Sequence, residues 1–299
     1  MWRGHHGSMA VGIIDVGSNT VRLQVSEGGQ ELHREKAVLK LGESVERLGA
    51  IPEAKLAETA DTVGEFIRIA RKQGADRVEV LVASPGRQAA NGEELLARLA
   101  VASGVPVRLL SAQEEGRLAF VGALTATRRG TRKLVAVCDV GGGSSQVAVG
   151  TRREGIAWVR SIDIGSIRLR SRLLGDDPPG EIAIHEARSE VDRLLEGFLP
   201  PAPELALVVG GSARALRSII GPDLGAAELE EVTEILARTP ANEIAARYNL
   251  HFERVLTLAA GAVILAALRE RLHVPLRVVR GGGVREGAAI ELASTRKAA

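Results

Sequence analysis

The stretch that decides the fold is "GIIDVGSNTVRLQV", Gly12 to Val25, because a closely similar stretch returns later in the chain. An apolar run ends at Asp15, passes through glycine and small polar residues, and becomes apolar again. This pattern predicts two strands joined by a tight turn. The second stretch, "VCDVGGGSSQVAV" at 137–149, repeats the order of strand, Asp-Val-Gly, small polar turn and strand, with Asp139 in place of Asp15. Such a repeat indicates an internal duplication on the scale of a domain.

The sequence around each hairpin alternates between helical and strand-like patterns, which predicts an α/β protein. The basic polar stretch "TRRGTRK" at 127–133 is the expected linker and hinge. We therefore expect an N-terminal domain over 9–128 and a C-terminal domain over 133–299. Two further glycine turns follow in the second domain, at 210–212 and 281–283. The last predicted helix, at about 285–296, is a candidate to pack back on the N-terminal domain.

The composition is that of a globular protein of 299 residues, with 45% hydrophobic and 25% charged residues. A net charge of +2 and an aromatic content of 2% argue against a nucleic-acid partner. The single cysteine, Cys138, excludes an internal disulfide and suits the reducing cytoplasm. The longest apolar stretch, Val255 to Leu268, is too short for a bilayer and predicts a buried helix, so we expect no membrane association.

The two hairpins could form a phosphate site. A glycine turn leaves backbone N–H groups open, so that an anionic oxygen can approach them closely. The aspartate before each turn only accepts hydrogen bonds when it is ionised, so it would hold Mg²⁺, which in turn binds phosphate. An ordinary turn is the alternative for either hairpin alone, but the duplication argues against it. The candidate metal ligands are Asp15 and Asp139. The candidate phosphate-binding residues are Gly17, Ser18, Asn19, Thr20, Gly141, Gly142, Gly143, Ser144, Ser145, Gly210, Gly211 and Ser212.

The motifs "DVGSNT", "DVGGGSS", "VVGGSAR" and "GGGVREG" together resemble the phosphate and nucleotide motifs of the actin, sugar kinase and heat-shock-70 fold. Asn19 in the first turn, with "ASPGRQAAN", "SAQEEGRL" and "SIDIGSIRL", resembles the exopolyphosphatase and guanosine pentaphosphate phosphohydrolase family. The matches run in the family's order from about residue 11 to residue 290 and fit its short form. The resemblance implies two duplicated ribonuclease-H-like domains of the actin-like ATPase fold, with a cleft between them.

The resemblance also implies an activity, the release of terminal phosphate from inorganic polyphosphate by water and Mg²⁺. Glu114 in "QEEGR" matches the family's catalytic glutamate, and such a carboxylate could orient or deprotonate water. Only one of Glu114 and Glu115 can face the cleft, because consecutive residues point to different faces of a helix. Both could instead serve only the start of that helix. Arg87 and Arg168 match family positions close to the cleft, Arg87 as a phosphate-binding residue.

One departure from the family leaves alternatives open. The family carries a glutamate after the second turn, where this chain has Gln146, an amide that cannot act as a base. A weakly active module that binds polyphosphate or an alarmone is therefore one alternative. Guanosine pentaphosphate is the other, because both substrates end in an anhydride. The family often dimerises, so a homodimer is a possible assembly. Arg22 would add charge to the clamp only if it faces inward, and "TRR" and "RLRSR", at 151–153 and 168–172, could extend an anion path.

Overall fold

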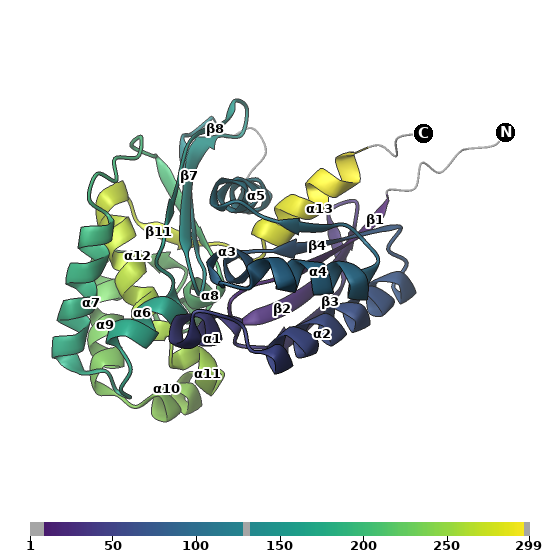
Figure 1. The fold of residues 1–299 in the computed structure, drawn as a ribbon. Helices are drawn as coiled ribbons and strands as arrows, with labels where there is room; N and C mark the ends of the chain where they lie inside the picture. Colours follow the sequence, from purple (N-terminus) through teal and green to yellow (C-terminus); the bar gives the residue numbers. More distant parts are fainter. Residues whose placement is uncertain (1–8, 128–131, 296–299) are drawn as a thin grey trace.

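The computed structural model describes residues 9–127 and 132–295 and arranges them as two α/β units, each built on one sheet (Figure 1). The first sheet contains β1 (Ala10–Val16), β2 (Thr20–Glu27), β3 (Gln30–Val38), β4 (Arg77–Val82) and β5 (Val107–Leu109). The second sheet contains β6 (Val135–Val140), β7 (Ser145–Thr151), β8 (Gly155–Ile162), β9 (Leu205–Val209), β10 (Asp223–Leu224) and β11 (Leu276–Val278).

The two sheets share one topology, with strand orders β3-β2-β1-β4-β5 and β10-β11-β9-β6-β7-β8. In each, three antiparallel strands come first, and two later strands, β4 and β5 or β9 and β11, add in parallel beside the first of them. The second sheet has one further strand, β10, which pairs antiparallel with β11 at its edge. The hairpins also agree in register, since Asp15 lies opposite Arg22 and Asp139 lies opposite Gln146. The duplication and the α/β fold of two ribonuclease-H-like units are thus confirmed.

Helices cover both faces of both sheets. The first half of the chain supplies α1 (Leu41–Leu48), α2 (Glu53–Lys72), α3 (Ser84–Gln88), α4 (Gly92–Ser103) and α5 (Ala112–Leu124). The second half supplies α6 (Ser166–Leu173), α7 (Gly180–Leu194), α8 (Gly211–Ile220), α9 (Ala226–Arg238), α10 (Ala241–Tyr248), α11 (Phe252–Val255), α12 (Leu258–Leu272) and α13 (Val284–Ser294). Because β1 is covered on both faces, it is apolar at nearly every position, with Ile14 and Val16 in one core and Val11 and Ile13 in another.

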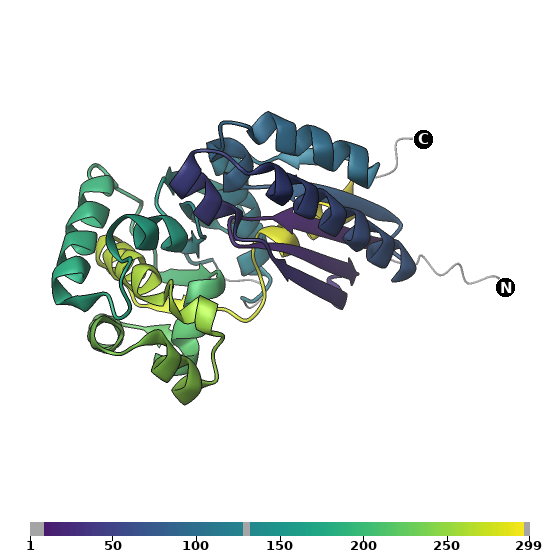
Figure 2. The same cartoon turned by 60° about the horizontal axis from the view of Figure 1, so that its bottom comes forward.

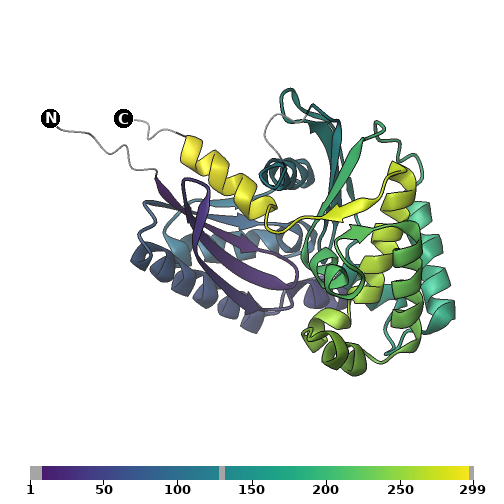
Figure 3. The same cartoon turned by 180° about the vertical axis from the view of Figure 1, so that it is seen from behind.

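Two helices, α5 and α13, pack against one another between the sheets (Figure 3). The last helix, α13, lies on β1 of the first sheet. Helix α5 belongs to the first half of the chain, but its Phe120 and Ala123 pack in one core with strands of the second sheet, and its Leu118 packs with the first. The two halves of the sequence, which meet at about residue 130, therefore do not pack separately. The last helix of each half, α5 or α13, packs on the sheet of the other half.

Several details differ from the patterns in the sequence. The apolar stretch over 253–272 is not one helix but α11 and α12, separated at Leu256 and Thr257. The side chain of Asn91 does not cap α4; its amide bonds instead to both the N–H and the carbonyl of Ile51. Of the expected hinge at 127–133, residues 128–131 lie outside the described part of the chain.

The described helices are short or polar for a membrane-spanning segment. No single helix among them is long and apolar enough to cross a bilayer, although the bent pair Ala241–Tyr248 and Phe252–Leu272 would pass together on length and composition. The apolar part of that pair, α12, is mostly buried between neighbouring helices. In Figure 2 it runs through the interior of the second unit.

Candidate active site

The ends of the two hairpins enclose a cavity of about 140 Å³ between the two units. It lies at the carboxyl ends of the parallel strands β1, β6 and β9, where α/β folds commonly bind ligands. Most of the residues expected to hold phosphate or metal line it. They are Asp15, Gly17, Ser18, Asn19, Thr20, Asp139, Gly141, Gly142, Ser144, Gly210 and Gly211.

The two turns have the same geometry and approach one another closely. Gly17 N–H donates to the Thr20 carbonyl (3.0 Å), and Gly141 N–H donates to the Ser144 carbonyl at the same distance. A Cβ atom on Gly142 would lie 2.9 Å from Cβ of Ser18 on the opposite turn. Glycine at this position therefore lets the two turns meet.

Three of the expected residues support the cavity without lining it. Ser145 Oγ donates to the Ile164 carbonyl (2.7 Å), so its hydroxyl is used inside the second unit. Gly143 leaves room for the Oγ atoms of Ser18 and Ser84, which lie within 2.9 Å of the position that a Cβ atom on residue 143 would take. Ser212 Oγ is buried without a hydrogen-bond partner among the described residues. The prediction that Ser145 offers its hydroxyl to phosphate is therefore corrected, and Gly143 and Ser212 do not line the cavity as expected.

Glu114, the expected catalytic residue, lies outside the cavity. Its carboxylate accepts from Ser111 N–H (2.8 Å), while Ser111 Oγ accepts from Glu114 N–H (3.1 Å), which forms a capping box at the start of α5. These bonds from Ser111 hold the pKa of Glu114 below its usual range. A carboxylate committed to a helix cap and outside the lining of the cavity is not placed to act on water there, so this assignment is corrected.

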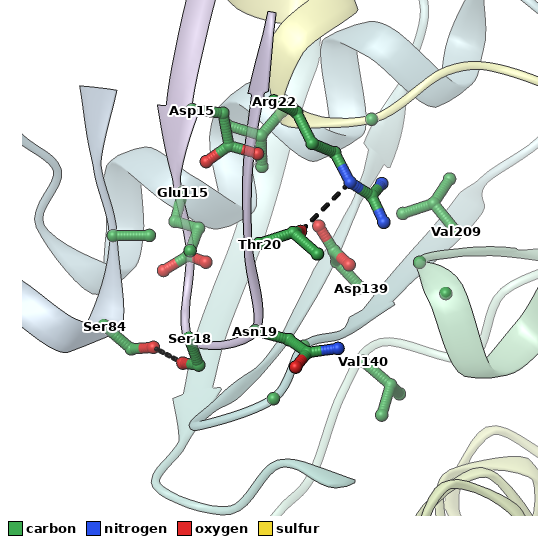
Figure 4. A pocket seen from close by; sticks show the side chains of 18 of the residues that line it. Asp15, Ser18, Asn19, Thr20, Arg22, Ser84, Glu115, Asp139, Val140 and Val209 are labelled. Carbon is green, nitrogen blue, oxygen red and sulfur yellow. Dashed lines mark hydrogen bonds between the residues drawn. The ribbon is translucent and has the colours of Figure 1, made fainter. Parts of the chain in front are cut away.

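The neighbouring glutamate, Glu115, lines the cavity in its place (Figure 4). Burial raises the pKa of its carboxyl to about 7, and the negative charges of Asp139 and Asp15 add to the rise, although Arg87 opposes it. Arg87 Nη2 donates to Glu115 Oε2 (2.8 Å) and Arg87 Nη1 donates to the Leu110 carbonyl (2.8 Å). A pKa near neutrality suits a general base, and Arg87 orients it rather than lining the cavity itself.

Asp15 and Asp139 face the same space as Glu115 from opposite hairpins (Figure 4). Burial, and secondarily the charge of Asp15, raises the pKa of Asp139 to about 6. Asp15 Oδ2 accepts from Arg285 Nη1 (3.2 Å). No cluster of three or more metal-ligating side chains occurs within residues 9–127 and 132–295. Mg²⁺ often takes only one or two carboxylates and completes its shell with water and phosphate, and two facing aspartates fit that donor set.

Four arginines line the cavity, and three of them were not expected from the sequence. They are Arg22, Arg214, Arg254 and Arg285. Arg22 faces inward, with its Nε donating to Thr20 Oγ1 (3.1 Å), and burial lowers its pKa to about 9, aided by Arg285 and Arg214. Burial likewise lowers the pKa of both Arg214 and Arg254. Arg214 and Arg285 directly follow glycine turns in "GGSAR" and "GGGVR", a signal that the sequence did offer.

These arginines make the cavity an anion site. Among the described residues, Arg22, Arg214 and Arg254 form no ion pair with a carboxylate, whereas Arg285 lies 3.2 Å from Asp15. Buried cations without a counter-charge are unfavourable, and a multiply charged anion would compensate them. Arginine also matches phosphate well, because its planar fork donates two parallel hydrogen bonds.

The other expected basic stretches take no part in the cavity. Arg168 is buried in ion pairs with Glu46 and Asp163. The Arg152 guanidinium donates to the carbonyl of Leu124 and to Thr127 Oγ1. The predicted anion path through 151–153 and 168–172 is therefore not supported at these two residues.

Comparisons with known proteins identify the family of the chain. A family model described as the Ppx/GppA phosphatase family matches residues 21–296. Exopolyphosphatase 1 of Mycobacterium tuberculosis is 29% identical, over 93% of this chain and 87% of that protein. Exopolyphosphatase 2 of the same organism is 27% identical, over 95% and 98%. The solved PPX-GPPA enzyme of Aquifex aeolicus is 25% identical, with a TM-score of 0.78 over 96% of this chain and 99% of that one. The chain therefore belongs to the Ppx/GppA phosphatase family and is a phosphoanhydride hydrolase with the actin-like fold.

Proposed function

We propose that the chain is an exopolyphosphatase that releases the terminal phosphate of inorganic polyphosphate by Mg²⁺-assisted attack of water. The observation that carries this proposal is the juxtaposition, around one cavity of about 140 Å³, of four carboxylates (Asp15, Glu115, Asp139 and Glu286) and three arginines that lack a carboxylate partner among the described residues. The names of the mycobacterial relatives support the same substrate.

In this proposal the terminal phosphoryl group lies between the two glycine turns, which donate backbone N–H bonds to its oxygens. Asp15 and Asp139 would hold Mg²⁺, which when bound neutralises charge on the phosphate oxygens. Glu115 orients the attacking water and takes its proton, and Arg87 fixes the direction of the Glu115 carboxylate. Arg285 beside Asp15 balances the negative charge on that side of the cavity.

Beyond the terminal phosphate, the arginines favour a chain of further phosphates. Lys36 of β3 pairs in register with Arg22 of β2, and its pKa is lowered first by burial and then by Arg22, Arg254 and Arg214. Positive charge therefore extends from the cavity toward the edge strand of the first sheet. Inorganic polyphosphate carries negative charge at every unit and suits such a continuous track.

Guanosine pentaphosphate is the second candidate substrate, because it also ends in a phosphoanhydride. No aromatic side chain lines the described cavity, so a guanine base finds no stacking surface there. The continuous positive charge and the lack of an aromatic side chain in the described lining favour inorganic polyphosphate.

A cytoplasmic location and a homodimer remain predictions. Cys138 is buried in the core, and burial raises the pKa of its thiol to about 12, so this thiol is unreactive.

The test is phosphate release from long-chain polyphosphate, tripolyphosphate and guanosine pentaphosphate, each with Mg²⁺ and with EDTA. We expect Mg²⁺-dependent release from the inorganic chains and slower release from the nucleotide. Faster turnover of guanosine pentaphosphate would overturn the substrate assignment. Tight binding of polyphosphate without release would identify the chain as a binding module.

A further inference from the structure

The hydroxyl of Ser144, in the second glycine turn, has an unusual set of partners. Ser144 lines the cavity and is buried. Its Oγ accepts from Gln146 Nε2 (2.9 Å) and from Arg87 Nη2 (3.3 Å). A serine hydroxyl has two acceptor lone pairs and one proton. Both lone pairs are taken by N–H groups, so the hydroxyl can only donate with its remaining proton.

No described residue accepts that proton from Ser144 Oγ. In contrast, Ser145 Oγ in the same turn donates to the Ile164 carbonyl. Ser18 Oγ in the first turn is shared with Ser84 Oγ (2.7 Å). Ser144 in the second turn thus keeps its proton for a ligand in the cavity, as does Thr20 in the first turn, whose Oγ1 accepts from Arg22 Nε (3.1 Å). The oxygens of a phosphate are acceptors only.

The direction in which the Ser144 hydroxyl donates its proton depends on Gln146, whose amide donates to it. This side chain is 1% exposed, and its Nε2 also donates to Ser161 Oγ (3.1 Å) of the adjacent strand β8. Its Oε1 is buried and has no partner among the described residues. The amide therefore uses only its donor side, although a buried acceptor without a donor is unfavourable. A buried amide with an unpartnered oxygen is explained if its N–H group is needed to orient Ser144, which lines the cavity.

We propose that Gln146 is a positioning residue that makes Ser144 a hydrogen-bond donor to the bound phosphate. A carboxylate at position 146 would accept the Ser144 proton and turn the hydroxyl away from the ligand. The amide of Gln146 is then not a poorer replacement for a carboxylate. It is the group that this arrangement of Ser144 and Arg87 requires. This inference rests on the proposed function, because it takes phosphate to be the ligand.

The test measures binding of tripolyphosphate in EDTA by titration calorimetry, so that neither metal nor turnover contributes. Loss of one hydrogen bond to a charged group should weaken binding by about tenfold or more in Ser144→Ala. Gln146→Glu should weaken it at least as much, and most of that loss should disappear when Ser144 is already alanine. Gln146→Met, which removes the donor without adding charge, should weaken binding less than Gln146→Glu.

Ser161→Ala is the matched control, because it removes the other partner of the same amide and leaves the cavity intact. We expect its affinity to equal that of the wild-type chain. With Mg²⁺, Gln146→Glu should raise KM more than it lowers kcat. Equal weakening by Gln146→Glu with and without Ser144 would overturn the proposal, since it would be a charge effect alone. Absence of binding by the wild-type chain in EDTA would overturn this inference, and absence of both binding and phosphate release with Mg²⁺ would overturn the proposed function as well.

Discussion

At the scale of single residues, the two consecutive glutamates of α5 have opposite roles. Glu115→Gln should lower turnover by about 10²–10⁴-fold, because the general base is removed while its shape is kept. Binding of polyphosphate should persist, since the arginines and glycine turns remain. Phosphate release and calorimetry would measure the two effects separately.

Glu114→Gln is the matched control for that variant. It changes the neighbouring carboxylate, which lies in the capping box with Ser111, so it should keep most of the turnover. Its loss of stability should be small, about 0.3–1 kcal/mol, because glutamine can also close a capping box and only the negative charge at the helix start is removed. Full loss of turnover in Glu114→Gln with an active Glu115→Gln would return the base to Glu114.

The raised pKa of Glu115 predicts how activity depends on pH. A base must be ionised, so kcat/KM should rise with pH and level off above about 7, the pKa of this carboxyl. The free energy of unfolding should change with pH in the opposite direction. The folded-state pKa is raised, so the contribution of the neutral carboxyl is full below its unfolded pKa and is lost as pH rises through about 7.

Activity profiles and denaturation at several pH values would check both parts of this prediction. Glu115→Gln should remove the pH dependence of stability that arises from this group. An activity profile that is already flat from about pH 5 upward would contradict a base with a near-neutral pKa.

The sequence located the glutamate that lines the cavity to within one residue, and the reason for the difference is physical. "QEEGR" locates both glutamates at a helix start, but which one faces the cleft depends on how α5 is rotated. That rotation is set by Phe120 and Ala123 packing on the second sheet, a contact between distant parts of the chain. Arg254 was missed for the same reason, since only the fold brings α11 to the hairpins.

At the scale of elements, the crossing of α5 and α13 depends on glycine. A Cβ atom on Gly122 of α5 would lie 2.0 Å from the Gly283 carbonyl oxygen, at the start of α13. Gly122→Ala should therefore push the helices apart and destabilise the fold by about 1–3 kcal/mol. Denaturation in urea would measure the change.

Gly64→Ala in α2 is the control for that substitution, because it is also a glycine inside a helix. Its Cβ would make an ordinary contact, 3.5 Å from the Ala102 carbonyl oxygen. Alanine has the higher helix propensity, so this variant should be equally or more stable, by up to about 1 kcal/mol. Two variants of equal stability would show that the crossing tolerates a side chain.

Element prediction from the sequence was most successful where local pattern and fold agree. The hairpins β1–β2 and β6–β7 appear close to where the apolar pattern predicted them. The break between α11 and α12 was not visible, because the apolar run continues through it. Packing of α12 among α7, α8 and α9, rather than propensity, determines where that helix begins.

At the scale of the whole molecule, ion pairs join the two units on the side of the cavity away from α5. Glu46 of α1 pairs with Arg168 and Arg172 of α6, and these helices lie side by side below the hairpins in Figure 1. The Glu46 and Arg168 side chains are 9% and 5% exposed, so this contact is shielded from water. Lys40 and Glu253 form a second pair between the units at 2.7 Å, but it is more exposed.

Because the ion pair of Glu46 with Arg168 is buried, its loss should weaken the contact between the two units along the whole cleft. Glu46→Gln removes the shielded partner of the buried Arg168 and leaves it only the exposed Asp163, which is expected to destabilise the contact between the units by about 1–3 kcal/mol. Glu253→Gln, the matched change at the exposed pair, should cost about 0–1 kcal/mol. If the pair holds the cleft closed, amide hydrogen exchange at Gly17–Thr20 and Gly141–Ser144 should quicken in Glu46→Gln before the sheets themselves exchange. Faster exchange spread evenly over both sheets would mean instead that Glu46 supports the fold as a whole and does not control opening between the units.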